Sequence, residues 1–253
     1  MKKNIFYPYS SHNTHPGFSV DCVILTFHEG RIKVLLARRH VMHEYWVLPG
    51  GFMFKDEDAD ISASRVLEGN TGLKNVYMKQ FYLFSDPKRT IIEQNRRILE
   101  MNGVDGDEDN NWFLQRFVSL GYYGLTRYEK MQGLVNESDI LRWFDIEELP
   151  KLYSDHANII NTAFDTIKAL LPAIPVAYEL LPEKFTMFEL RKIYEIILER
   201  TFDRRNFQRK VLMNGNIIQL DERKKCNAYN PPILYSFDPA MDKNITTISN
   251  ATL

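Results

Sequence analysis

The hydrophobic pattern of the first part of the chain predicts a sheet of short strands with helices between them. Two apolar, β-branched runs at 19–27 and 33–39 flank a polar turn that contains Gly30, which is typical of a β-hairpin. Apolar residues recur at helical spacing from 155 to 171, which indicates an amphipathic helix that closes this region. The same criteria predict strands at 45–48, 76–84 and 116–126, a chain break at 49–51, and a helix at 58–67 that stops by Gly72.

The pattern changes after residue 171. Three prolines between 171 and 182 cannot lie inside a helix and therefore mark a connection. Thr186 and Glu189 have the spacing of a capping box ahead of a helix predicted at 187–200.

A second helix is expected at 204–213, where Asp203 is placed to cap its start and Asn214-Gly215 to end it. Strands predicted at 217–220 and 233–237 enclose a basic turn at 221–227. The two helices and the hairpin form the outline of a helix-turn-helix with a wing.

Composition limits the kinds of protein that this chain represents. A length of 253 residues with 44% hydrophobic content is enough to bury a substantial core. No apolar run is long enough to span a membrane, and the first residues lack the apolar segment of a secretory signal, so we expect a soluble cytoplasmic protein that does not contact membranes. Cys22 and Cys226 are too isolated for a disulfide framework or a zinc site, and we expect one packed and one surface thiol.

Charge is uneven along the chain, although the formal net charge is only −1. Basic residues outnumber acidic ones between 184 and 225, whereas an acidic stretch at about 102–111 belongs to an apparent insertion near 90–111 and is expected to form a solvated loop. A basic segment alone is also compatible with a solvated face. The helical spacing favours a DNA-binding face over a merely solvated one. Phe207 and Val211 form a buried stripe on the second helix, so its basic and polar residues face outward.

Guanidinium groups suit guanine edges and phosphates, amides suit adenine, and lysines suit phosphates, so we expect these outward residues to contact DNA. A small domain that binds protein or only dimerises is the alternative. The candidate DNA contacts are Arg204, Arg205, Asn206, Gln208, Arg209 and Lys210 on the helix, and Arg223, Lys224 and Lys225 in the wing.

Residues 46–73 resemble the signature of the Nudix family, in which glycine, glutamate and a glutamate-rich helix follow at fixed spacing. The positions in register are Gly51, Glu57, Arg65, Leu67, Gly72 and Leu73, preceded by Trp-Val-Leu-Pro-Gly at 46–50. In Nudix hydrolases the helix directs carboxylates at Mg²⁺ or Mn²⁺, which neutralises a diphosphate and positions the attacking water.

The glutamate positions of that helix are occupied here by Val66, Gly69 and Asn70, none of which offers a carboxylate. Glu68 lies between them and is turned to another side of the helix. We therefore expect no enzymatic activity, no catalytic residue, no metal and no cofactor, with Glu57 and Arg65 paired as scaffold. An active Nudix hydrolase of a nucleoside diphosphate derivative is the alternative.

The two halves together resemble the Nudix-related transcriptional regulators. The resemblance rests on Phe-Thr-Met-Phe-Glu-Leu at 185–190 and Asp-Arg-Arg-Asn-Phe-Gln-Arg-Lys at 203–210, and it covers roughly 16–237. It implies an α+β protein: a Nudix α/β/α sandwich at 1–172 for effector binding and dimerisation, a winged helix-turn-helix at 173–240, and a disordered tail at 241–253.

The resemblance to this family implies that the protein is a homodimer and acts as a repressor. It implies further that the protein leaves a double-stranded DNA operator when a small effector molecule binds. The effector is ADP-ribose in regulators of NAD metabolism and a pentose such as arabinose in regulators of sugar use. A phosphate group would need cationic side chains in the pocket, and a sugar would need polar and aromatic side chains. Each candidate residue is also compatible with a role in a surface ion pair or as a core aromatic. The candidate effector-binding residues are Arg38, Arg39, Trp46, Asp86, Arg89 and Tyr123, the insertion near 90–111 being a departure from the family pattern.

Overall fold

The computed structural model describes residue 6 and residues 8–42, 44–104, 112–128, 139–170, 176–213, 215–225 and 229–238. The chain forms two compact units. The first comprises Met1–Ile24, Val34–Gly124 and Met131–Ala163, and the second comprises Leu25–Lys33, Leu125–Lys130 and Phe164–Leu253.

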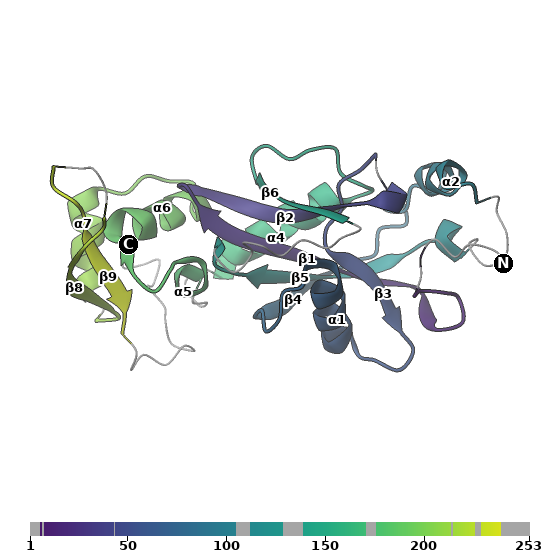
Figure 1. The fold of residues 1–253 in the computed structure, drawn as a ribbon, viewed down its shortest axis with the longest axis horizontal. Helices are drawn as coiled ribbons and strands as arrows, with labels where there is room; N and C mark the ends of the chain where they lie inside the picture. Colours follow the sequence, from purple (N-terminus) through teal and green to yellow (C-terminus); the bar gives the residue numbers. More distant parts are fainter. Residues whose placement is uncertain are drawn as a thin grey trace. The chain divides into compact units, whose positions relative to one another are not determined.

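A six-stranded sheet forms the centre of the first unit (Figure 1). Its order is β4-β5-β1-β2-β6, with β3 paired to β1. The strands are β1 Thr14–His28, β2 Arg31–Arg39, β3 Gly50–Phe54, β4 Met78–Phe84, β5 Val118–Leu125 and β6 Asp139–Asp145.

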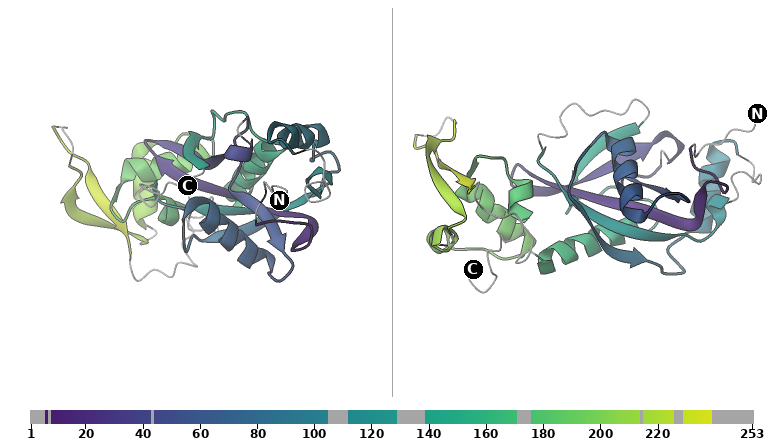
Figure 2. Two further views of the ribbon diagram at one scale, coloured as in Figure 1. Left: turned by 45° about the vertical axis from the view of Figure 1, so that its right-hand side comes forward. Right: turned by 90° about the horizontal axis from the view of Figure 1, so that it is seen from below.

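Helices cover both faces of this sheet, with α1 and α4 on opposite sides (Figures 1 and 2). Asp58 caps α1 by accepting a hydrogen bond from the Ile61 amide at 2.8 Å, and Gly72 ends the helix in the left-handed conformation, at φ 71°. The helical segments are α1 Ala59–Thr71, α2 Ile92–Met101 and α4 His156–Leu170, with 3-10 turns η1 His40–Met42 and η2 Trp112–Leu114.

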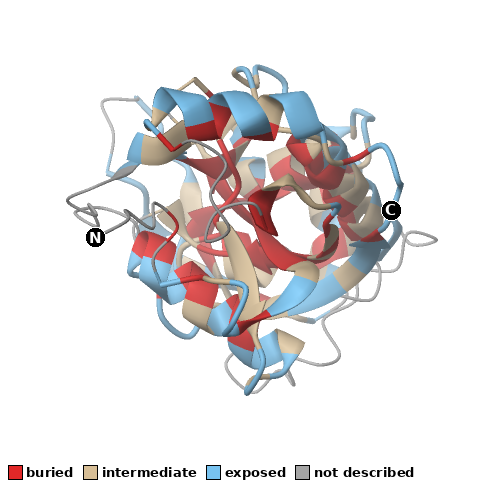
Figure 3. Ribbon diagram, turned by 90° about the vertical axis from the view of Figure 1, so that its right-hand side faces the viewer, coloured by how far each residue is buried: buried red, intermediate tan, exposed pale blue. Residues whose placement is uncertain are grey.

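The core of the first unit follows the alternation of β1. Val20, Cys22 and Ile24 are fully buried and pack with Ala63 and Val66 of α1. Alternate residues of a strand point to opposite faces, so Asp21 lies on the face away from α1. Figure 3 shows buried positions gathered on the strands and on the inward sides of the helices.

The second unit contains a three-stranded sheet of order β7-β9-β8 next to short helices (Figure 2). Its capping box is formed as predicted, because the Thr186 amide donates to Glu189 Oε2 at 2.7 Å and the Glu189 amide donates to Thr186 Oγ1 at 3.3 Å. The elements are α5 Val176–Leu180, β7 Phe185–Thr186, α6 Met187–Ile197, α7 Arg204–Met213, β8 Ile217–Arg223 and β9 Ile233–Phe237.

Most predicted elements are confirmed within one to three residues, but the prediction for 45–48 is wrong. That segment makes only isolated bridges at Trp46 and Val47, and a strand begins at Gly50, where a break was expected. The glycines allow this strand to approach β1 closely: a Cβ on Gly50 would lie 2.4 Å from Asp21 Oδ1.

Helix α2, helix α5 and strand β7 were not predicted from the sequence. Helix α2 lies inside the insertion near 90–111, where Ile98 and Leu99 are buried. Helix α5 lies in the proline-rich connection, beginning just after Pro175 and ending before Pro182, so that neither proline interrupts it. Strand β7 has two residues, too few for a period-2 pattern to be visible.

Some predictions fall on residues outside the described ranges, namely the loop at 105–111, Asn214, Cys226, Asn227 and the tail at 241–253. Cys22 is buried as expected. Over the described residues, no helix has both the length and the apolarity needed to cross a membrane.

Candidate functional site

Glu57 and Arg65 form the expected pair and join the loop after β3 to helix α1. Arg65 donates to both carboxylate oxygens, from Nε at 2.8 Å and from Nη2 at 2.5 Å. The Phe54 amide also donates to Glu57, and Arg65 reaches the Phe52 carbonyl at 3.0 Å. Burial disfavours the charged carboxylate, but the hydrogen bonds from Arg65 and Phe54 outweigh it and hold the pKa of Glu57 below its usual value.

The remaining signature positions on α1 are structural or exposed. Val66 is 1% exposed and packs in the core. The side-chain amide of Asn70 donates to the Val66 carbonyl at 2.6 Å and to the Gly50 carbonyl at 3.2 Å. Glu68 is exposed and pairs with Lys74 at 2.9 Å. In the described part of the chain, no group of three or more His, Cys, Asp or Glu residues is placed to hold a metal ion.

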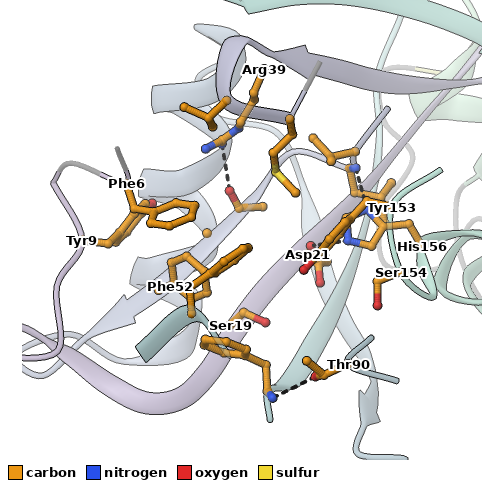
Figure 4. A pocket seen from close by; sticks show the side chains of 18 of the residues that line it. Phe6, Tyr9, Ser19, Asp21, Arg39, Phe52, Thr90, Tyr153, Ser154 and His156 are labelled. Atoms are coloured by element: carbon orange, nitrogen blue, oxygen red, sulfur yellow. Dashed lines mark hydrogen bonds and ion pairs between the residues drawn. The ribbon is translucent and has the colours of Figure 1, made fainter. Parts of the chain in front are cut away.

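A pocket with about 870 Å³ of free space, part of it open to solvent, lies in the first unit (Figure 4). In Figure 4 the labelled aromatic residues Phe6, Tyr9 and Phe52 lie toward one side, and Asp21, Ser154 and His156 lie toward the other, which we call the polar side. The aromatic lining is Phe6, Tyr9, Phe52, Phe113 and Phe117, and the polar lining includes Ser19, Asp21, Arg39, Arg89, Thr90, Tyr153, Ser154 and His156.

Arg89 is the centre of a buried charge network on the polar side. Its side chain is 7% exposed and makes a two-pronged contact with Asp155, at 3.0 Å from Nε and 2.9 Å from Nη2. Nη1 donates to the Phe117 carbonyl at 3.2 Å, and Asp21 Oδ2 lies 3.9 Å from Nη2. Ser119 donates to the same Asp21 oxygen at 2.5 Å. A buried charge needs such partners, and Arg89 has one carboxylate in direct contact and a second within 4 Å.

His156 is the first residue of α4 and lies against this network. Its Nδ1 accepts a hydrogen bond from the Leu48 amide at 2.9 Å, and its Nε2 lies 3.7 Å from Asp21 Oδ1. Burial lowers the pKa of His156. The imidazole is therefore neutral at pH 7, with its proton on Nε2.

In the second unit, α7 presents a cationic face to solvent. Arg204, Arg205 and Arg209 are exposed, whereas Phe207 and Val211 are buried beneath them. Asp203 caps the helix by accepting from the Asn206 amide at 2.9 Å.

Two family models match this sequence. The NUDIX domain model matches residues 15–163, which is more than half of the chain. The chain belongs to the NUDIX family. Residues 177–237 match the NrtR DNA-binding winged helix domain. Together the two matches place the protein among the Nudix-related regulators and confirm the predicted α+β arrangement of a NUDIX domain followed by a winged helix.

Relatives along most of the chain carry the same arrangement. The ADPR responsive transcriptional repressor NtrR of Acinetobacter baylyi is 27% identical over 230 residues, covering 88% of this chain and 82% of that protein. Shewanella oneidensis NrtR, solved with a 27mer DNA, has a TM-score of 0.68 at 23% identity and covers 91% and 96% of the two chains. A MutT/nudix family protein from Enterococcus faecalis has a TM-score of 0.63 at 22% identity, with 88% and 87% covered.

The NUDIX domain brings only part of the predicted effector set into its pocket. Arg39 and Arg89 line the pocket. Arg38 is the neighbour of Arg39 on the same strand, so it points to the other face, where its guanidinium lies 5.3 Å from the centre of the Trp46 ring.

Trp46, Asp86 and Tyr123 are also absent from the pocket lining. Tyr123 is 2% exposed in the core against Phe81, and Asp86 accepts from the Lys88 amide at 2.8 Å in a turn beside a separate hollow. Sheet register and not residue chemistry decides which side chains converge, so this pocket contains Arg39 and Arg89 but not these three. Contact between any of the candidates and an effector stays a prediction.

The sequence reasoning missed Asp21, Tyr153 and His156 as pocket residues. A usable signal existed for Asp21, because an acidic residue inside the apolar run 19–27 is unusual unless it has a buried partner. Tyr153 donates to Asn95 Oδ1 of α2, so the insertion helps to hold the pocket. No sequence pattern near Tyr153 or Asn95 indicated that the two residues are in contact.

The predicted DNA-contact residues of the winged helix differ in exposure and in their partners within the protein. Gln208 is half-buried and donates to the Tyr235 hydroxyl at 3.1 Å, because it lies one residue after Phe207 and partly faces β9. Lys224 pairs with Glu189 at 2.6 Å, which ties the wing to the start of α6. Arg223 and Lys225 are exposed on the wing, and Lys210 is half-buried on α7.

Proposed function

We propose that this protein is a DNA-binding transcriptional repressor that a small molecule, bound in the NUDIX pocket, releases from its operator. The observation that carries the proposal is the exposed arginine face of α7, positioned by a capped two-helix motif and followed by a basic wing. Arginines on such a helix can bind guanine O6 and N7 with two hydrogen bonds and can also bind phosphates.

The relatives support the same assignment and narrow the effector. The Acinetobacter baylyi protein is named for its response to ADPR, so ADP-ribose is our first candidate, and a pentose such as arabinose is the second. The regulated genes would then serve NAD-related or sugar metabolism. We propose a homodimer working in the cytoplasm, in which two winged helices read the half-sites of a pseudo-palindrome.

Hydrolysis is not favoured by the site. Metal-dependent cleavage of a diphosphate needs carboxylates that neutralise its charge. At the corresponding positions, Val66 is in the core and the Asn70 amide is bonded to backbone carbonyls. We propose that α1 is kept as scaffold for the pocket and not as a catalytic helix.

Selection of a binding site from random duplex DNA, followed by fluorescence anisotropy on the selected duplex, tests this function. We expect affinity to fall steeply as salt rises, and Arg205→Ala to weaken binding about tenfold or more through loss of a base or phosphate contact. Arg96→Ala is the matched control, because Arg96 is an exposed helical arginine in the first unit. ADP-ribose or a pentose should release the DNA. Equal binding by the two variants, or no selected sequence, would overturn the proposal.

A further inference from the structure

Two arginines of the NUDIX domain converge on the ring of Trp46, outside the pocket. Arg38 lies on β2, and Arg142 lies on β6, the neighbouring strand at the end of the sheet (Figure 1). The guanidinium carbon of Arg38 is 5.3 Å from the centre of the indole ring, and that of Arg142 is 5.7 Å from it. None of the three residues lines the pocket. We call Arg38 and Arg142 the arginine pair.

The arginine pair has no acidic partner in the part of the chain that the structure describes. Both residues are exposed, and their guanidinium groups make neither an ion pair nor a hydrogen bond with a described residue. Arg65, Arg89 and Arg97 of the same domain differ, because they contact carboxylates at 2.5, 2.9 and 2.8 Å. Two like charges at one ring repel each other, so an anion that contacts both arginines lowers the free energy of this cluster.

The indole ring holds the arginine pair in a form that suits an anion. A guanidinium that lies over an aromatic ring presents its flat face to that ring, so the N–H groups at its edge stay free to donate. Phe144 packs edge-to-face against Trp46 at 4.6 Å and also lies 6.0 Å from the Arg142 guanidinium. Contacts that order the side chains in advance reduce the entropy that a ligand loses when it binds.

The number of donors favours a phosphate group over a carboxylate. Each guanidinium is a planar fork that can bind two oxygens of one anion. A single fork already uses both oxygens of a carboxylate. A terminal phosphate offers three acceptor oxygens and carries nearly two negative charges at pH 7, so it can serve both forks and neutralise both arginines.

We propose that the arginine pair binds the terminal phosphate of a small molecule, at a site separate from the NUDIX pocket. The ligand class is a phosphate monoester or a compound that ends in a diphosphate, and Trp46 is the platform that holds the two guanidinium groups. This site is inferred from the first unit alone, so it does not depend on the DNA-binding function or on the effector of the pocket.

Titration of the full-length protein with ribose 5-phosphate, inorganic pyrophosphate and D-ribose at constant ionic strength tests the site. Calorimetry measures affinity and stoichiometry. Tryptophan fluorescence gives a local signal, because a phosphate that contacts the arginine pair changes the charge next to the Trp46 ring. D-ribose is the matched ligand without a phosphate, and we expect the fluorescence change only with the two phosphate compounds.

Arg38→Gln and Arg142→Gln should each weaken the binding of both phosphate compounds about tenfold or more, the usual effect of a hydrogen bond to a charged group. Arg38→Lys keeps the charge but not the fork, and it should weaken binding about threefold or more. Arg96→Gln is the matched control and should bind as the wild type does, because Arg96 is an exposed arginine of the same domain that pairs with Glu93 at 3.6 Å. The arginine pair is exposed, so these variants should fold.

Three results would overturn the site. The first is that neither phosphate compound binds to the wild type. The second is that Arg38→Gln and Arg142→Gln bind within about twofold of the wild type, a difference too small for a lost hydrogen bond to a charge. The third is an equal loss in Arg96→Gln, which would show a general effect of charge.

Two further comparisons separate the site from its neighbours. Arg39 is the next residue on β2 and lines the pocket, so a loss in Arg39→Gln with none in Arg38→Gln assigns the phosphate to the pocket and overturns the proposal. Anisotropy on the selected DNA uses the same variants. Unchanged DNA affinity in Arg38→Gln together with lost phosphate binding supports a small-molecule site. A fall in DNA affinity without binding of either phosphate compound assigns the arginine pair to the DNA backbone and overturns it.

Discussion

Replacing Arg65 by alanine tests whether the signature pair is now scaffold. Glu57 is 7% exposed at its side chain and Arg65 is 30% exposed, so the substitution leaves a largely buried carboxylate that keeps two donors, the Phe54 amide and the Ser62 hydroxyl. Removing one partner of a fully buried pair costs about 3–5 kcal/mol. The exposure of Arg65 and the two remaining donors reduce that figure, and we expect about 2–3 kcal/mol, including loss of the contact between the guanidinium and the Phe54 ring at 4.1 Å.

Urea unfolding at pH 7, followed by tryptophan fluorescence, measures this change in the free energy of unfolding. The double-mutant cycle with Glu57→Gln isolates the coupling between the two side chains, which we expect at about 1–2 kcal/mol. The pKa of Glu57 is lowered in the folded protein. The contribution of Glu57 to the free energy of unfolding is therefore fully present above the pKa of Glu in the unfolded chain, about 4.3. It is lost as pH falls through the lower pKa of the folded protein. A loss below about 0.5 kcal/mol at pH 7, or no coupling, would refute the scaffold role.

Three further predictions follow from the contacts described. His156→Asn keeps an acceptor for the Leu48 amide but removes the titrating group. Because the pKa of His156 is lowered in the folded protein, the free energy of unfolding of the wild type should fall as pH drops below about 6.5. Urea titrations at pH 5 and pH 7 should show this fall in the wild type and not in the variant. Lys224→Ala frees the wing from Glu189 and should weaken DNA binding by about two- to tenfold in anisotropy, whereas an unchanged affinity would exclude a role for this ion pair in positioning the wing. ADP-ribose with Mg²⁺ should yield no monophosphate, and turnover abolished by Glu57→Gln would contradict the inactive-site interpretation.

The signals that predicted the second unit are short-range. Thr186 and Glu189 lie one helical turn apart and form a capping box wherever a helix follows, and Asp203 caps α7 for the same reason. The spacing of Phe207 and Val211 alone decides which side of α7 is buried. Gln208 was harder to place, because it lies at the boundary of the buried stripe and its partner Tyr235 comes from another element.

The sequence by itself determined where α1, α4, α6 and α7 lie to within a few residues, which face of α7 carries arginines, and that the carboxylates of the signature helix are missing. Each of these depends on residues within about one or two helical turns. Only the tertiary structure decided the pocket. Asp21 on β1, Arg89 before α2 and His156 on α4 meet because strand register and helix packing bring distant segments together. A shift of one residue in β1 would turn Asp21 toward α1, and side-chain chemistry alone does not specify that register.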